Sequence, residues 1–330
     1  MDEEKRAIGT RMIRTTEDAK RRGRGVLLLP LVLVLGLLAG GCQEQKTESP
    51  TKGHLKILAA ESVEPIVREI ADSFQVKYPE AKFEVSSVSS REAIVKLING
   101  DATLIVVGRD FNPQEDSVIR KYNIQVSKHV VAYDGVAALV NERNPVKQLT
   151  TTDLANILEG NVNRWNAFKG GRAEPIRIVT KDPNAGTYEF VSRRLLGGRR
   201  FPAPVTVVPS SPAVVEDVAA HGNALGFVGL YALHGTMLPV RPLELSDPSV
   251  NPDTIRTVAK VFSPHPAYVY LHYYPLTRPI VLYSTEYLYG LGGGFISFIA
   301  SPDGQRLFLK AGLVPATQNI RLVPASPESN

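Results

Sequence analysis

The order of apolar and polar positions along the chain predicts a regular succession of strands and helices. Residues 55–60 ("LKILAA") are typical of a buried strand, and residues 62–78 have the period of an amphipathic helix that begins with Ser62 as its cap and closes before Pro79. A strand over 82–88, a serine turn, a helix over 91–100 and a strand over 102–108 repeat this scheme. Because strands alternate with crossover helices, we expect an α/β fold with mainly parallel strands.

The pattern starts again after residues 129–141. A helix over 151–160 with a threonine cap, a strand over 175–179 and a helix over 186–198 ended by glycine come next. A helix then leads through Gly222 and Gly226 into another strand, and a last strand over 277–284 precedes a long helix broken at 301–304. The restart predicts two lobes, each a mixed sheet flanked by helices. Residues 55–132 with 261–315 form the first lobe, 133–260 form the second, and 316–330 are a C-terminal tail.

The N-terminal residues have the composition of a targeting signal. A basic cluster precedes an apolar run over residues 26–39, which is shorter than the roughly 20 residues that a membrane-spanning helix needs. The sequence "LAGGC" that follows resembles a bacterial lipobox, in which the cysteine is acylated. We therefore expect residues 1–41 to be a lipoprotein signal peptide and Cys42 to carry a lipid that anchors the protein to a membrane of the bacterial cell envelope. The polar residues 42–54 are expected to be a flexible tether.

Charge and composition narrow the classes of function. The net charge is +5, but residues before Cys42 hold eight basic and five acidic side chains, so the remainder carries only two positive charges and does not indicate nucleic-acid binding. The six histidines lack metal-ligand spacing, and no nucleophile motif appears. We expect no metal, no cofactor and no enzymatic activity, and a monomeric chain. Paired carboxylates in a cleft, acting in an enzyme, remain an alternative.

Hydroxyl residues recur where predicted strands lead into helices. Ser62, the pair Ser89 and Ser90, and Thr187 all lie at such turns. Turns at the carboxyl ends of parallel strands gather at one edge of the sheet, and helix N-termini bind anions there. Each hydroxyl alone is more often an ordinary helix cap. Together with the nearby cations Arg109 and Lys181, the turns predict a site for one small anion.

Five segments, taken in order, resemble the PstS type of phosphate-binding lipoproteins of bacterial ABC uptake systems. The likeness runs from about residue 55 to about residue 315, and the segments are "LTTTDLANILEGNVNRWNAF", "KDPNAGTYEF", "NALGFVGL", "YPLTRPIVLY" and "FISFIASPDGQRLFLKAGLVP". The resemblance implies a two-lobed periplasmic-binding-protein-like fold of type II. It also implies phosphate, or a related oxyanion, in a cleft between the lobes, and an ABC permease as membrane partner.

The same resemblance assigns the ligand contacts. It places Ser62 and Ser90 on the family's hydroxyl donors, Lys181 on the arginine that grips phosphate, and the turn of Ala185, Gly186 and Thr187 on the family's serine-glycine-threonine turn. Arg109 is the further cation.

This chain departs from the family pattern at several of these positions. Ala185 and Gly108 stand where the family has hydroxyl donors, and Arg91 and Glu92 replace small residues. At about 1.5–3 kcal/mol for each charge-assisted hydrogen bond, two lost donors weaken binding by roughly two to four powers of ten unless the cations compensate.

Two further questions stay open at the level of sequence. Preference for phosphate over sulfate needs an acceptor for the proton of hydrogen phosphate, and Asp110 and Asp134 are the candidates.

The alternative to transport is a sensor or partner-binding lipoprotein with a degenerate pocket, whose interface would be the tyrosine-rich segment 265–276. We favour the simpler interpretation that this segment is a hinge strand packed between the lobes.

Overall fold

The computed structural model describes residues 49–249, 261–286 and 289–317, which belong to one compact unit spanning residues 48–330. Cys42, the predicted signal peptide and most of the predicted tether and tail lie outside the described residues. Among the helices of the described ranges, none combines the length and the apolar character needed to cross a bilayer.

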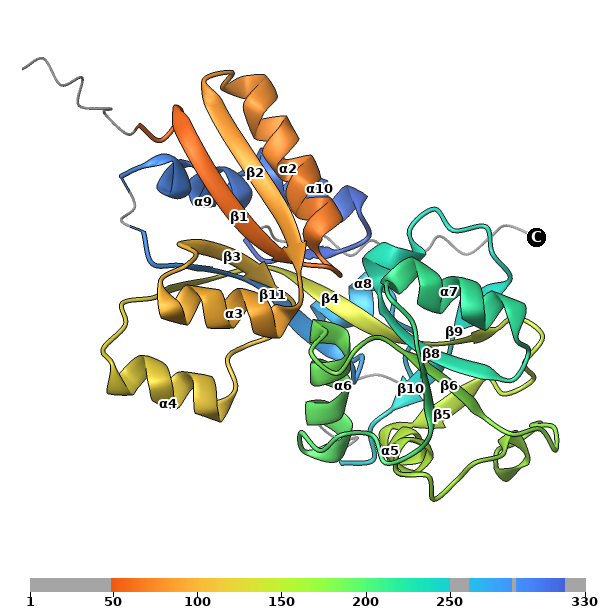
Figure 1. Ribbon diagram of the computed structural model, residues 1–330. Helices are drawn as coiled ribbons and strands as arrows, with labels where there is room; N and C mark the ends of the chain where they lie inside the picture. The colour runs from red at the N-terminus through yellow and green to blue at the C-terminus, as the bar shows by residue number, and fades with distance from the viewer. Residues whose placement is uncertain (1–48, 250–260, 287–288, 318–330) are drawn as a thin grey trace, which may run out of the picture. The chain divides into compact units, whose positions relative to one another are not determined.

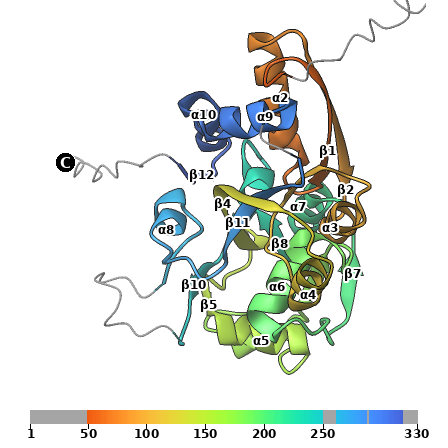
Figure 2. The ribbon, with the colours of Figure 1, turned by 90° about the vertical axis from the view of Figure 1, so that its left-hand side faces the viewer.

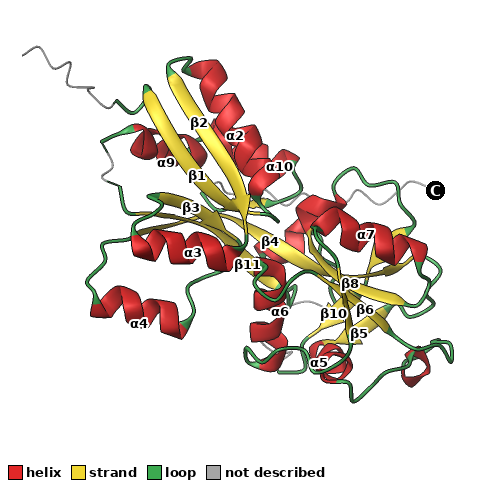
Figure 3. Cartoon of the chain, in the orientation of Figure 1, coloured by secondary structure: helices red, strands yellow, loops and turns green. Residues whose placement is uncertain are grey.

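The first half of the fold is a mixed sheet with helices packed on it (Figures 1 and 3). In spatial order its strands are β2 (Ala81–Val88), β1 (Gly53–Ala60), β3 (Leu104–Val107) and β11 (Thr277–Ser284). Its helices are α2 (Glu64–Lys77), α3 (Ser90–Asn99), α4 (Pro113–Lys121), α9 (Leu291–Ala300) and α10 (Pro302–Lys310). The first core joins strands and helices through fully buried side chains such as Ile57, Phe74, Ile94 and Phe295. Gly53 and His54, which the sequence analysis placed in the tether, pair with Ala81 and Lys82 of β2.

The second half has the same layered construction (Figure 2). Its strands are β8 (Ala224–Gly229), β6 (Arg177–Thr180), β7 (Val205–Val207) and β9 (Val240–Pro242), with a separate pair β5 (Gln148–Thr150) and β10 (Glu244–Ser246). Its helices are α5 (Thr151–Glu159), α6 (Gly186–Leu196), α7 (Ser211–Ala220) and α8 (Pro266–Tyr270), with the 3-10 turns η1 (Trp165–Ala167) and η2 (Leu230–Leu233). The second core includes Leu154, Trp165, Phe227 and Tyr274.

One long strand, β4 (Ser127–Asn141), belongs to both halves. Eight of its first nine residues pair with β11, with a register shift at Val131, and the five from Val136 to Val140 pair with β8. The short β12 (Val314–Pro315) also pairs with β4. The strands from β2 to β7 in this spatial order therefore form a single hydrogen-bonded path, apart from the separate pair β5 and β10. The chain crosses from one half to the other between Gly135 and Val136.

The mixed α/β fold that we predicted is confirmed, whereas the predicted lobe ranges stay a prediction. Phe262, Val269 and Tyr274 pack in the second core, and Ile280 packs in the first. This packing favours a return to the first lobe close to residue 277, where β11 begins, instead of residue 261.

Two local predictions were wrong. The segment 265–276 is not a hinge strand, because the His265 side chain accepts a hydrogen bond from the amide of Ala267 and Pro266 begins the short helix α8. Ser62 does not cap α2. Val63 occupies the cap position without a side-chain hydrogen bond, and the Ser62 hydroxyl is left for another role.

Candidate oxyanion site

Four loops that follow strands surround one cavity of about 290 Å³. They are the loops from β1 to α2, from β2 to α3, from β6 to α6 and from β7 to α7. Five of the seven predicted contact residues line the cavity, namely Ser62, Ser90, Lys181, Ala185 and Gly186. The first two come from the first half of the fold and the other three from the second half, so the structure brings the predicted turns together.

The hydroxyl groups of Ser62 and Ser90 are buried and have no hydrogen-bond partner among the described residues. The Ser90 side chain is fully buried. Its neighbour Ser89 is the actual cap of α3, since the Ser89 hydroxyl accepts from the amide of Glu92 at 3.1 Å. Because buried hydroxyls in proteins are normally hydrogen-bonded, two unpartnered ones on the same cavity indicate a polar ligand.

The N-terminus of α6 forms the opposite wall. Ala185 is the N-cap residue and has no side chain that could accept from the first amides of the helix. A Cβ on Gly186 would lie far inside van der Waals contact of the Ser90 hydroxyl, so glycine permits the two halves to approach at this point. Thr187 is buried and does not line the cavity. The backbone of this turn, together with the helix dipole, provides an environment for negative charge.

Lys181 is the one cation among the residues that line the cavity, and it is 4% exposed. Its ammonium forms an ion pair with Glu61 and donates to the Ser211 hydroxyl at 2.8 Å. Burial lowers the pKa of Lys181, and the Glu61 carboxylate opposes that shift. The predicted phosphate-gripping cation thus already has an anionic partner. Our sequence analysis did not identify Glu61, although a carboxylate directly after a buried strand and beside Ser62 was a usable signal.

Arg109 lies away from the cavity. Its guanidinium is 2% exposed, donates to both carboxylate oxygens of Glu115 at 2.8 and 2.9 Å, and also contacts Glu189 and the carbonyl of Asp110. These carboxylates raise the pKa of Arg109 against the opposing effect of burial, which is the largest single influence. Because Nε, Nη1 and Nη2 of Arg109 all donate to groups of the protein, Arg109 is not included among the ligand contacts that we propose.

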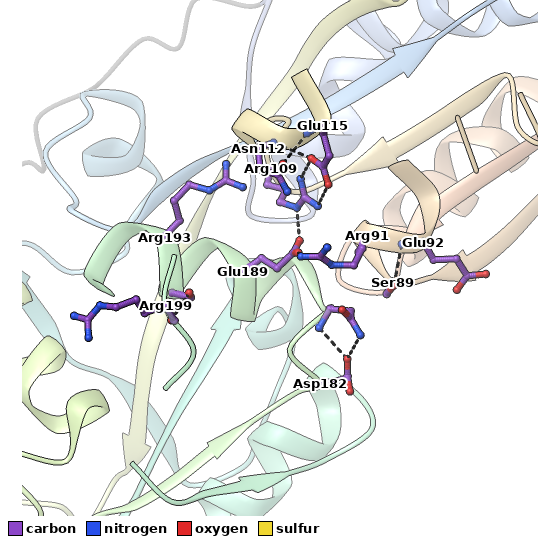
Figure 4. A network of polar contacts seen from close by, with 12 residues as sticks. Ser89, Arg91, Glu92, Arg109, Asn112, Glu115, Asp182, Glu189, Arg193 and Arg199 are labelled. Carbon is purple, nitrogen blue, oxygen red and sulfur yellow. Dashed lines mark hydrogen bonds and ion pairs between the residues drawn. The ribbon is translucent and has the colours of Figure 1, made fainter. Parts of the chain in front are cut away.

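Figure 4 shows Glu189 of α6 between Arg109 and Arg91. The Arg91 guanidinium lies 3.0 Å from Glu189. A wider groove of about 720 Å³ is lined by Arg91, Glu189, Arg193 and Arg200 beside this network. Since α3 and the loop after β3 belong to the first half and α6 to the second, the Glu189 contacts join the halves independently of the cavity.

A buried cation that the sequence analysis missed lies behind the α6 turn. Arg278 of β11 is fully buried, donates to the Asp134 carboxylate and donates from Nη1 to the Thr187 hydroxyl at 3.1 Å. A Cβ on Gly108 would be 3.1 Å from this guanidinium, so Gly108 makes room for Arg278. The signal that we missed was an arginine in a mostly apolar strand. A charged side chain at such a position is normally buried only when it is paired.

Neither predicted proton acceptor lines the cavity. Asp110 pairs with Lys128 at 2.5 Å, and Asp134 is engaged by Arg278. The carboxylates that do line it are Glu61 and the exposed Asp182. The cavity therefore combines unpartnered hydroxyls and a helix N-terminus with a lysine whose positive charge is paired with the Glu61 carboxylate. No cluster of potential metal ligands occurs within the described ranges.

Comparison with known proteins identifies the family of the chain. The family model for the PBP superfamily domain matches residues 44–303. The chain is 24% identical over 301 residues to the phosphate-binding protein PstS of Bacillus subtilis, covering 88% of this chain and 93% of that protein. It is 22% identical to the PstS protein of Pseudomonas aeruginosa, with 82% and 86% covered.

A solved structure supports the same fold. The ABC-type phosphate transport receptor of Vibrio cholerae superposes with a TM-score of 0.62 at 23% identity, covering 79% of this chain and 99% of that one. The resemblance predicted from the five segments and the two-lobed α/β fold are thus confirmed.

Proposed function

The chain belongs to the PBP superfamily, and on this premise we propose that it is an extracytoplasmic solute-binding protein that captures phosphate, or a related oxyanion, for an ABC transporter. The names of the relatives from Bacillus subtilis and Pseudomonas aeruginosa support phosphate as the ligand. The Vibrio cholerae neighbour is an ABC-type phosphate transport receptor, which supports the transport role.

The observation that carries the proposal is the pair of buried, unpartnered hydroxyls of Ser62 and Ser90 on one cavity. Phosphate oxygens accept hydrogen bonds from hydroxyls and from helix N-terminal amides, and this cavity presents both kinds of donor. The proposed contacts are Ser62, Ser90, the backbone of the turn from Ala185 through Gly186 to Thr187, and the ammonium of Lys181. The proposed contacts are hydrogen-bond donors, which suit the holding of an anion, so the proposed role is binding without catalysis.

Attachment through a lipid on Cys42 is part of the proposal. The lipobox-like sequence "LAGGC" supports it, and the polar residues that follow would let a monomeric chain reach its permease. Replacing Cys42 by serine is expected to move the protein from the membrane fraction to the soluble fraction. Unchanged partitioning would contradict lipid anchoring.

Calorimetry with phosphate tests the proposed ligand directly. We expect one phosphate to bind per full-length chain, and Ser90→Ala to weaken binding roughly ten- to hundredfold, because a charge-assisted hydrogen bond is lost. Ser297→Ala is the matched control, since its hydroxyl donates to the carbonyl of Gly293 within α9 and does not line the cavity. Sulfate added at equal and at tenfold excess then measures selectivity. Absence of heat with both anions would contradict the proposal and favour the degenerate-pocket alternative.

A further inference from the structure

The cavity contains a carboxylate of the protein itself at its cationic end. Besides the Lys181 ammonium, two groups of Ser211 contact Glu61. The Ser211 amide donates to Oε1 at 2.8 Å, and the Ser211 hydroxyl donates to Oε2 at 3.2 Å. Three donors from the second half of the fold thus converge on a carboxylate from the first half.

These donors have the character of an anion site. Ser211 is the first residue of the ten-residue helix α7, whose cap Ser210 accepts from the amide of Ala213. Pro212 has no amide hydrogen, so the Ser211 amide is the donor that the start of this helix presents. With the helix dipole and a lysine that is almost fully buried, the surroundings favour a bound negative charge.

We propose that Glu61 is an internal anion, whose carboxylate occupies an anion subsite formed by Lys181 and the start of α7. An external oxyanion therefore reaches the lysine only by displacing Glu61. This inference extends the proposed function. It depends on that function only for the identity of the external anion.

The distribution of charge supports this role. Two carboxylates, Glu61 and Asp182, line the cavity beside a single lysine, so the lining residues carry no excess of positive charge. An oxyanion held next to an ionised Glu61 experiences repulsion that water screens poorly in a buried site. The Ser90 hydroxyl on the same cavity remains unpartnered. Glu61 thus occupies only the cationic part of the cavity and leaves the hydroxyl part free.

Acetate tests the subsite without reference to phosphate. In Glu61→Ala the three donors lose their carboxylate, and sodium acetate is expected to raise the melting temperature of the full-length variant above the value in sodium chloride of equal ionic strength. Glu84→Ala, which removes an exposed carboxylate paired with Lys56, is the matched control and should show no acetate-specific rise. Glu61→Ala/Lys181→Met should also show none, because the cation of the subsite is gone.

Phosphate calorimetry gives the second readout. Glu61→Ala and the isosteric Glu61→Gln are expected to bind phosphate roughly ten- to hundredfold more tightly than the wild type, since the anion contacts Lys181 without first displacing a carboxylate. If the alanine variant fails to fold, Glu61→Gln provides the same test, because it removes the charge and keeps the shape of the side chain. If wild type and variants all fail to bind phosphate while acetate stabilises Glu61→Ala, the subsite stands and the proposed ligand falls. An acetate response no larger than that of Glu84→Ala, or weaker phosphate binding by both Glu61 variants, would overturn the inference.

Discussion

The guanidinium of Arg278 and the carboxylate of Asp134 form a buried ion pair, with 2.7 Å between Nη2 and Oδ2, at directly paired positions of β11 and β4. Asp134 lies two residues before Val136, where β4 begins to pair with the second half of the sheet. Through Nη1, Arg278 also donates to Thr187 at the start of α6. The pair therefore connects the crossing point of the chain with the turn that walls the cavity.

Removing one partner of this pair is expected to destabilise the fold strongly. In Arg278→Met the Asp134 carboxylate stays buried without its cation, which costs about 3–5 kcal/mol in free energy of unfolding. Urea denaturation measures the loss. The double variant Arg278→Met/Asp134→Leu removes both charges and should recover much of it. A single variant as stable as the wild type would contradict the structural role of the pair.

Gly186 is expected to be required for the close approach of the two halves. In Gly186→Ala the new methyl group meets the Ser90 hydroxyl, and overpacking of this kind typically costs about 1–3 kcal/mol. Phosphate affinity should fall as well, because Ser90 is displaced. Gly222→Ala is the control, since no heavy atom lies within 4 Å of a Cβ at that position. Equal effects of the two substitutions would contradict the contact.

The sequence predicted most elements because their patterns are local. The strand over 277–284 coincides with β11, and the break at Ser301 is real because its hydroxyl accepts from the amide of Gly304 and caps α10. The helix over 186–198 ends at Gly197, which has the left-handed backbone conformation. The helix α4 was missed, although Asn112 and Glu115 form a capping box at its start.

The site was predicted only in part, because partners distant in sequence decide it. Hydroxyl residues at strand ends identified Ser62 and Ser90, which the topology brings to one cavity. Which cation faces that cavity depends on carboxylates far away in the sequence. Glu189, 80 residues from Arg109, engages that arginine, and Glu61, 120 residues from Lys181, engages the lysine. No local pattern contains these pairings.

Glu189 is expected to stabilise contact between the halves. Glu189→Ala deprives Arg109 and Arg91 of a common partner, and we expect a loss of about 1.5–3 kcal/mol in free energy of unfolding. The radius of gyration of the ligand-free protein, from small-angle X-ray scattering, should increase. Arg91→Ala is the matched comparison, because this arginine is half-exposed and its pair with Glu189 contributes about 0–1 kcal/mol. A larger effect of Arg91→Ala than of Glu189→Ala would contradict this assignment.

The pKa of Lys181 is expected to lie below its ordinary value of 10.5, because burial disfavours the charged ammonium. In the pH range between the folded-state pKa and 10.5, the unfolded chain binds more protons, so the contribution of Lys181 to the free energy of unfolding rises with pH. That contribution falls as pH drops through the folded-state pKa.

Carbon-13 NMR of the lysine Cε, assigned with Lys181→Arg, measures this titration. Glu61→Gln should lower the pKa further, because the neighbouring negative charge is removed, whereas Glu84→Gln should leave it unchanged. Titration at or above 10.5 in the wild type would be inconsistent with a buried Lys181.

Arsenate, the heavier analogue of phosphate, locates the ligand most directly. In crystals of the protein grown with arsenate, the anomalous difference map at the arsenic absorption edge shows where the anion binds. The proposed function predicts one strong peak in the cavity, within hydrogen-bonding reach of the Ser62 and Ser90 hydroxyls and the amides at the start of α6. A peak in the groove lined by Arg91, Arg193 and Arg200, or no peak at all, would contradict it.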